Sequence, residues 1–188
     1  MLPPDEIRAL LREHDDPSRR ERPRDFDLEV AAHRFARLTA ALEERFAPSG
    51  SSGLYQDASA YGVFSVSPQD TDAGTDTDAG TDTDAGLWVE LSNFGGFVTA
   101  GTGRDWSEPG AADGLSRAFV TWLDELCTGA GCVLVPLRIL LEPYEGPTPT
   151  LADDDRIFLE ALAAAGYDDA GGEEVTPPVW ADRYFQWV

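Results

Sequence analysis

The stretch LWVELSNFGGFVTA, residues 87–100, decides the fold of this chain. In its first half aliphatic residues alternate with other residues, which is the period of a strand that buries one face. The aliphatic set is Leu87, Val89 and Leu91, and the alternating set is Trp88, Glu90 and Ser92. Gly95 and Gly96 form a two-residue hairpin signal, and residues 97–100 supply the returning strand. The stretch therefore predicts an antiparallel hairpin.

Two further segments on either side of this hairpin read as strands. Residues 61–66, YGVFSV, are rich in aromatic and β-branched residues, so we expect a three-stranded antiparallel meander. Residues 132–135, CVLV, predict one further, buried strand. Residues 49–53, SGSSG, are expected to break the pattern between a helix and the meander. For residues 136–142 two alternatives stay open, a short helix that begins at Pro136 or a continued strand.

Helical spacing of apolar residues predicts the remaining elements. A short helix begins near Pro4, and a long one covers residues 26–46. A third helix starts at Asp113 as its cap and ends at residues 128–129, a fourth contains residues 157–165, and a turn or helix follows residues 176–178. The predicted fold is α+β: a single domain over residues 1–188, with the helices packed largely on one face of the sheet. Residues 1–24 form its N-terminal helix and charged linker.

Three near-identical hexads occupy residues 69–86, each with the pattern Thr/Gln-Asp-Thr-Asp-Ala-Gly. A solenoid repeat must offer an apolar face to its neighbour, and these hexads offer only an Ala methyl group. Calcium loops with alternating oxygen ligands also require a Glu at position twelve or an apolar residue in each repeat. We therefore expect a disordered repeat loop without a metal site.

Acidity is the most unusual property of the composition. The 188 residues hold 35 Asp and Glu against 14 Arg and no Lys, which gives a formal net charge of -21. Residues 1–46 carry a net of -2, and residues 47–188 carry -19. Such a charge disfavours nucleic acids and anionic membranes as partners. The absence of Lys excludes Schiff-base catalysis and a Walker-type phosphate loop.

Composition also bears on the origin and location of the chain. Abundant Ala and Arg without Lys favour a bacterial, high-GC genome. No apolar run reaches the roughly 18 residues of a membrane span, and the N-terminus lacks the basic and apolar regions of a signal peptide. We therefore expect a cytoplasmic protein.

Candidate reactive groups are few. His14 and His33 are the only histidines, and neither belongs to a zinc motif. Cys127 and Cys132 flank a helix end and a strand start, which favours two buried thiols over a redox pair. Residues 101–106, GTGRDW, lack the last glycine of the dinucleotide fingerprint, and no nucleophile elbow occurs. The sequence predicts no catalytic residue, no cofactor and no metal.

Six residues are the candidates for binding a partner protein. Trp88, Glu90 and Ser92 share one face of a strand, and that face is expected to be open. The other three are Trp180, Tyr184 and Trp187 in the aromatic tail. The tail has two interpretations: it closes the core by packing on the sheet, which is favoured, or it forms an exposed interface anchor.

These observations favour a non-enzymatic, acidic binding protein that selects a basic protein partner by electrostatic steering, such as an immunity or antitoxin-type inhibitor. One alternative is an accessory or adaptor protein without an inhibitory role. Another is an enzyme that uses carboxylates such as Asp57, Glu90 or Asp105. Neither the identity of the partner nor the oligomeric state follows from the sequence.

Overall fold

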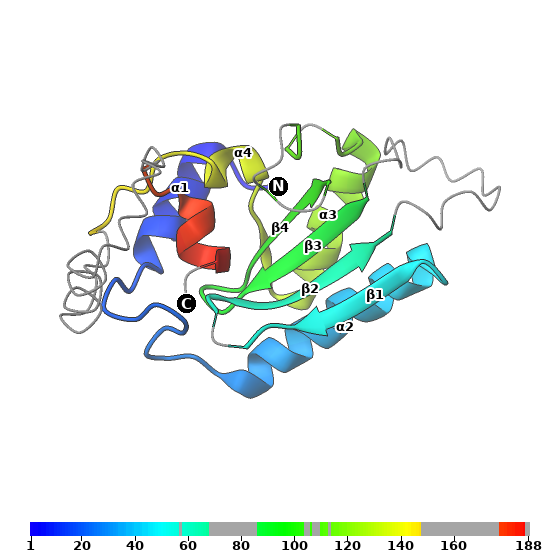
Figure 1. The fold of residues 1–188 in the computed structure, drawn as a ribbon, viewed down its shortest axis with the longest axis horizontal. Helices are drawn as coiled ribbons and strands as arrows, with labels where there is room; N and C mark the ends of the chain where they lie inside the picture. The colour runs from blue at the N-terminus through cyan, green and yellow to red at the C-terminus, as the bar shows by residue number, and fades with distance from the viewer. Residues whose placement is uncertain are drawn as a thin grey trace, which may run out of the picture.

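The computed structural model contains one five-stranded mixed sheet in the order β1-β2-β3-β4-β5 (Figure 1). It describes residues 1–56, 58–67, 86–103, 106, 110–112, 114–147 and 177–186. The strands are β1 (Gly50–Leu54), β2 (Ala60–Val66), β3 (Leu87–Ser92), β4 (Phe97–Thr102) and β5 (Val133–Leu134). The first four pair antiparallel and β5 pairs parallel to β4. The α+β class is thus confirmed, and the expected three-stranded meander is corrected to a four-stranded one.

Strand β1 is the element that the sequence did not predict. Its residues GSSGL lack the alternation of apolar and polar side chains that marks a strand, and most of them are exposed. The pairing partner supplies the reason for its small residues: a Cβ atom on Gly50 would lie 2.2 Å from the Phe64 ring. The segment expected to interrupt the pattern between the helix and the meander is therefore an edge strand, formed by pairing with β2.

Two helices cover the back face of the sheet in Figure 1. They are α2 (Leu28–Phe46) and α3 (Arg117–Ala130), and their apolar stripes pack on the aliphatic residues of β3. Asp27 caps α2 by accepting hydrogen bonds from the N–H groups of Glu29 and Val30. The cap of α3 is Ser116, three residues after the predicted Asp113, which lies outside the described residues.

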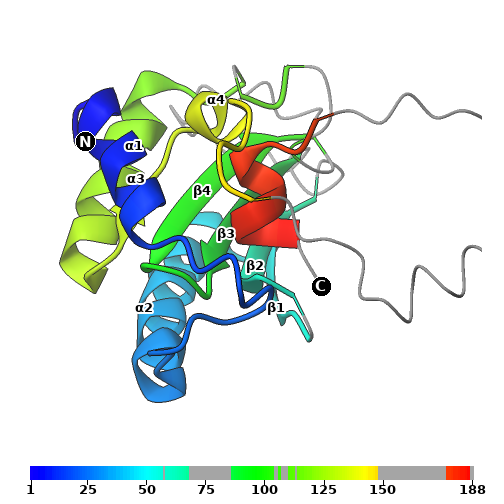
Figure 2. The same ribbon diagram turned by 90° about the vertical axis from the view of Figure 1, so that its left-hand side faces the viewer.

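Two shorter helical elements lie on the opposite, front face: α4 (Leu137–Leu140) and the π-helical turn η3 (Asp182–Gln186), drawn in yellow and red (Figures 1 and 2). Helix α1 (Pro4–Glu13), drawn in blue, lies on the side of α3, where the Met1 amino group pairs with Asp124. With Trp88 and Phe97 of the sheet these three elements form a second core cluster. The expectation that helices lie largely on one face is wrong, because this face carries large side chains that need cover.

The turn between β3 and β4 and the segment after β5 follow the sequence. Gly95 and Gly96 adopt φ values of 59° and 67°, the left-handed region that favours glycine in a tight turn. Residues 137–140 are helical, which settles the alternatives left open after Pro136. The predicted helix at residues 157–165 and the hexads at 69–85 lie outside the described residues. Among the described helices, none combines the length and apolarity that crossing a membrane requires.

Candidate functional site

The face of β3 that was expected to be open is covered. Trp88 is 4% exposed and Ser92 is 2% exposed. The Trp88 ring lies over Gly101 of β4, where a Cβ atom would come within 2.4 Å of the ring. Ser92 donates a hydrogen bond of 2.7 Å to the carbonyl of Tyr184 in η3. The prediction of an open face is therefore corrected: burial removes both side chains from the accessible surface.

The aromatic tail lies in the core, as its packing interpretation requires. Trp180 stacks on Tyr184 with 5.8 Å between ring centroids, and Tyr184 meets Phe94 and Phe97 edge to face. Tyr184 is fully buried and its hydroxyl donates to the carbonyl of Leu11 in α1. Trp187 lies outside the described residues. Trp180 and Tyr184 thus join the tail to the sheet and to α1.

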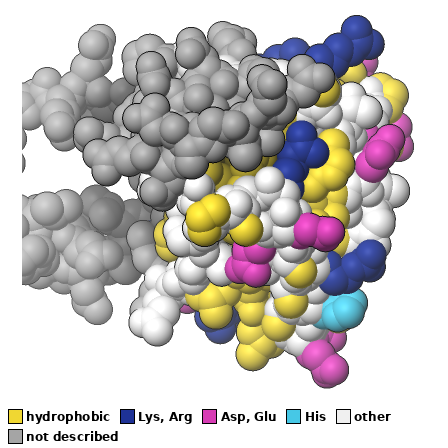
Figure 3. Space-filling view, turned by 90° about the vertical axis from the view of Figure 1, so that its right-hand side faces the viewer, with side chains coloured by type: hydrophobic (Ala, Val, Ile, Leu, Met, Phe, Trp, Pro, Cys, Tyr) yellow, Lys and Arg dark blue, Asp and Glu magenta, His cyan; other side chains and the backbone are white. Residues whose placement is uncertain are grey.

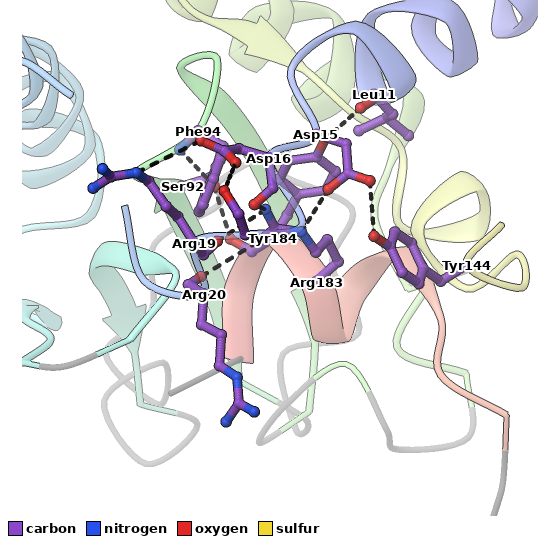
Figure 4. A network of polar contacts seen from close by, with 11 residues as sticks. Leu11, Asp15, Asp16, Arg19, Arg20, Ser92, Phe94, Tyr144, Arg183 and Tyr184 are labelled. Carbon is purple, nitrogen blue, oxygen red and sulfur yellow. Dashed lines mark hydrogen bonds and ion pairs between the residues drawn. The ribbon is translucent and has the colours of Figure 1, made fainter. Parts of the chain in front are cut away.

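A buried ion pair that the sequence analysis did not identify lies beside these rings (Figure 4). Arg183 is 0% exposed, and its Nε donates to Asp15 Oδ1 at 2.7 Å. Its Nη1 donates to the carbonyl of Arg20, and its Nη2 donates to those of Asp16 and Arg19, all in the linker after α1. Its guanidinium carbon lies 4.2 Å from the Phe94 ring centroid. One signal was available, since an Arg inside a tail predicted to pack needs a buried anionic partner.

Asp15 connects this pair to a third element. Its second oxygen accepts a hydrogen bond of 2.7 Å from the Tyr144 hydroxyl. Burial, and then the Asp15 carboxylate, raise the pKa of Tyr144. The Tyr144 phenol therefore remains a donor at neutral pH. Asp15, Arg183 and Tyr144 fasten the N-terminal linker to the C-terminal turn, which is a structural role.

A polar cavity of about 600 Å³ lies between the linker, α2 and the turn after β3. Three of its acidic residues already have structural partners. Asp15 binds Arg183, Asp16 accepts from Ser18 Oγ, and Asp27 caps α2. Its other two carboxylates, Glu13 and Asp25, are exposed to water. Among the described residues that line the cavity, no two buried carboxylates form a pair of the kind that acid-base catalysis uses.

The two thiols are buried and separate. Burial raises the pKa of Cys132 to about 11 and that of Cys127 further still. Both therefore stay protonated at neutral pH. Among the described residues no group of three His, Cys, Asp or Glu side chains could hold a metal ion. Asp57 and Asp105, two carboxylates of the enzyme alternative, lie outside the described residues.

Glu90 is the one predicted partner-binding residue that reaches the surface among those described. It is half-buried, and its carboxylate accepts a hydrogen bond of 2.8 Å from Tyr55, just beyond β1. Burial, and then the charge of Glu90, raise the pKa of Tyr55. Leu54 and Tyr55 are 64% and 41% exposed. The accessible end of the predicted site therefore adjoins the edge strand.

The charge is distributed unevenly along the chain. The described residues hold 17 Asp and Glu against 12 Arg, a net of -5. Eighteen acids and two Arg, a net of -16, belong to the other segments. On the face drawn in Figure 3, acidic and basic side chains of the described part are interspersed with hydrophobic ones. Most of the acidity of the chain thus lies outside the described ranges.

Two of these segments join the sheet at the same end. Val66, Leu87 and Thr102 are register neighbours across β2, β3 and β4. The connections that leave and enter at these residues carry nine acids between positions 68 and 113 against one Arg. Gly50 of β1 belongs to the same row through its pairing with Val66. The acidic connections and the edge strand therefore share one end of the sheet.

No model of a known protein family, no curated protein and no solved structure matches this chain.

Proposed function

We propose that this protein is a non-enzymatic binding protein for a basic protein partner, which it neutralises as an immunity or antitoxin-type inhibitor does. The observation that carries the proposal is the net charge of -21, of which -16 belongs to residues outside the described ranges. Acidic chain held near a partner raises the rate of encounter with a positively charged surface.

The state of the potentially reactive groups supports binding over catalysis. The thiols are buried and protonated, and the buried Asp15 is committed to Arg183 and Tyr144. The exposed positions carry carboxylates and arginines, and the half-buried Glu90 pairs with Tyr55. This chemistry suits a surface that recognises charge.

The experiment begins with the full-length chain as bait in an extract of its native cells at low ionic strength. Proteins eluted by salt are purified, and the association and dissociation rates of each are measured between about 0.01 and 1 M ionic strength. We expect association to slow at least tenfold while dissociation changes little. The partner's own activity should fall as it is saturated with this protein. An association rate indifferent to salt would contradict the proposal.

A matched pair of variants separates charge from loop structure. Replacing Asp76, Asp78, Asp82 and Asp84 together by Asn changes the net charge from -21 to -17. The control replaces Thr75, Thr77, Thr81 and Thr83 by Ser in the same hexads and leaves the charge unchanged. Only the Asn variant should associate more slowly at low salt.

A further inference from the structure

We propose that β1 binds an extended, basic segment of the partner, which adds to the sheet as a sixth strand. The inference rests on the proposed function and names the place where the partner would dock. Strand addition uses the backbone groups that an edge strand leaves unpaired, and side chains on either face then supply specificity.

The register of β1 and β2 shows which backbone groups face outward. The Tyr55 N–H donates to the Tyr61 carbonyl at 3.1 Å, so Tyr55 and Tyr61 form a hydrogen-bonded pair. Bonded and non-bonded pairs alternate in an antiparallel ladder. Ser51 and Gly53 therefore point their N–H and C=O groups toward β2, and Ser52 and Leu54 point theirs away from the sheet. No described strand pairs with that outer side.

The edge lacks the usual protections against pairing. Natural edge strands are commonly blocked by charged side chains, by proline or by a bulge. Residues 47–56 contain no charged residue, although 26% of the chain is charged, and Pro48 precedes the strand. The irregularity of this sheet lies between β2 and β3 and not in β1. Strand β1 therefore presents a regular backbone edge that can accept another strand.

Helix α2, which runs alongside β1 in Figure 1, provides an apolar floor beside that edge. Arg45 lies over the Trp122 ring of α3, and Arg34 and Arg37 approach the glycines at the end of α3. Three residues on the opposite flank follow one another at four-residue steps and are exposed: Leu28, Ala32 and Ala36. We call this flank and the outward backbone of Ser52 and Leu54 the β1 edge surface.

Charge identifies the occupant as a basic segment. All three Arg residues of α2 lie on the flank that faces α3, and the exposed Glu43 follows Ala36 by seven residues, on the flank of Ala36 and Ala32. A second copy of this chain would bring together two bodies of charge -21, which disfavours a β1–β1 dimer. A basic strand meets no such repulsion.

The geometry also predicts the pattern of the added strand. In the added strand, the residues opposite Ser52 and Leu54 point to the same face of the sheet as those two side chains. That face is the one covered by α2, so these residues should be apolar. The residues between them share the face of Ser51 and Gly53, which across β2 is also the face of the Glu90 carboxylate, so they should be basic. The expected segment therefore alternates apolar and basic residues.

The probe is a short, end-capped peptide in which Val alternates with Arg, added to the full chain. Two derivatives carry N-methyl groups, one on every Val amide and the other on every Arg amide. In antiparallel addition the Val amides bond to the edge, so we expect binding to fall at least tenfold for the first derivative and little for the second. The reverse order would indicate parallel addition. Equal binding of both derivatives would overturn the inference. This test uses the unmodified protein, so it does not depend on whether a variant folds.

Two variants test the same edge from the side of the protein. Ser52→Pro removes an outward N–H and should weaken peptide binding roughly tenfold or more. Ser52→Thr keeps that N–H and should bind as the parent does. Unchanged binding by a folded Ser52→Pro protein, checked by its thermal melt, would contradict the inference.

The outcomes also separate this inference from the proposed function. A captured basic partner that binds in a salt-dependent way, but equally well to Ser52→Pro, would leave the function standing and overturn the docking site. A peptide with Glu in place of Arg that binds as tightly would overturn the basic occupant. A dimer that forms with rising protein concentration and protects the β1 amides from exchange would also overturn the basic occupant, because a second copy would then fill the edge.

Discussion

Strands β3 and β4 lie at the centre of the sheet and are buried on both faces, whereas β1 at the edge is exposed along nearly all its length. The central strands carry large side chains that pack under helices from the N-terminal and C-terminal parts of the chain. The edge strand carries small residues, and no described strand pairs with its outer backbone side. Stability is therefore expected to depend on side chains at the centre, and binding on main-chain groups at the edge.

The largest effect is expected from the Asp15–Arg183 ion pair on the front face of the central strands. Arg183→Ala leaves the Asp15 carboxylate, only 9% exposed, without its charged partner. The free energy of unfolding, measured in urea, should fall by about 3 to 5 kcal/mol. Arg138→Ala, at an exposed position of α4, is the control and should change it by less than about 0.5 kcal/mol.

A double variant sharpens this prediction. Asp15→Asn with Arg183→Met removes both charges and should recover part of the loss. A loss below about 1 kcal/mol for Arg183→Ala alone would show that the centre does not depend on this pair.

The next effect compares two neighbouring residues of the edge strand. Ser51→Pro removes an N–H that the register directs to β2, and Ser52→Pro removes one that points outward. The first variant should lose about 1 to 3 kcal/mol more of the unfolding free energy than the second. Equal losses would mean that the alternation along β1 is assigned wrongly.

A smaller effect is expected from two buried hydroxyls. Thr99 Oγ1 in β4 is buried and has no hydrogen-bond partner among the described residues, whereas Thr39 Oγ1 in α2 donates to the Phe35 carbonyl at 3.0 Å. Thr99→Val should leave stability unchanged or raise it by up to about 1 kcal/mol, because an unsatisfied group is removed. Thr39→Val should lower it by about 1 kcal/mol. Thermal melts of both variants check this, and a Thr99→Val protein that is less stable than Thr39→Val would contradict the prediction.

The smallest effect is a pH dependence at the surface. Two hydrogen bonds from Arg8 lower the pKa of Glu142 below its ordinary value of about 4.3. A lowered carboxyl pKa gives stability that is present above the unfolded value and is lost as the pH falls through the folded value. Glu142→Gln should therefore be less stable than the parent at neutral pH and equal to it in acid. The exposed Glu125→Gln should show no such convergence.

Periodicity predicted the elements that bury apolar faces, namely α1, α2, the hairpin of β3 and β4, and the strand at β5. It missed β1, because a strand of Gly and Ser has no periodicity and exists through pairing with β2. Periodicity also led to the wrong expectation that one face of β3 is open. Alternation alone does not show that η3 returns to cover Trp88 and Ser92. The Asp15–Arg183 pair joins residues 168 positions apart, a distance that local patterns cannot bridge.

The most direct test of the account is amide hydrogen exchange of the full chain, free and with its basic partner or the Val–Arg peptide bound. In the free protein the N–H groups of Ser51 and Gly53 should be protected and those of Ser52 and Leu54 should exchange rapidly. Binding should slow Ser52 and Leu54 at least tenfold and leave the amides of β3 and β4 as they were. Rapid exchange at Ser52 and Leu54 in the saturated complex would contradict the claim that partners bind at this edge.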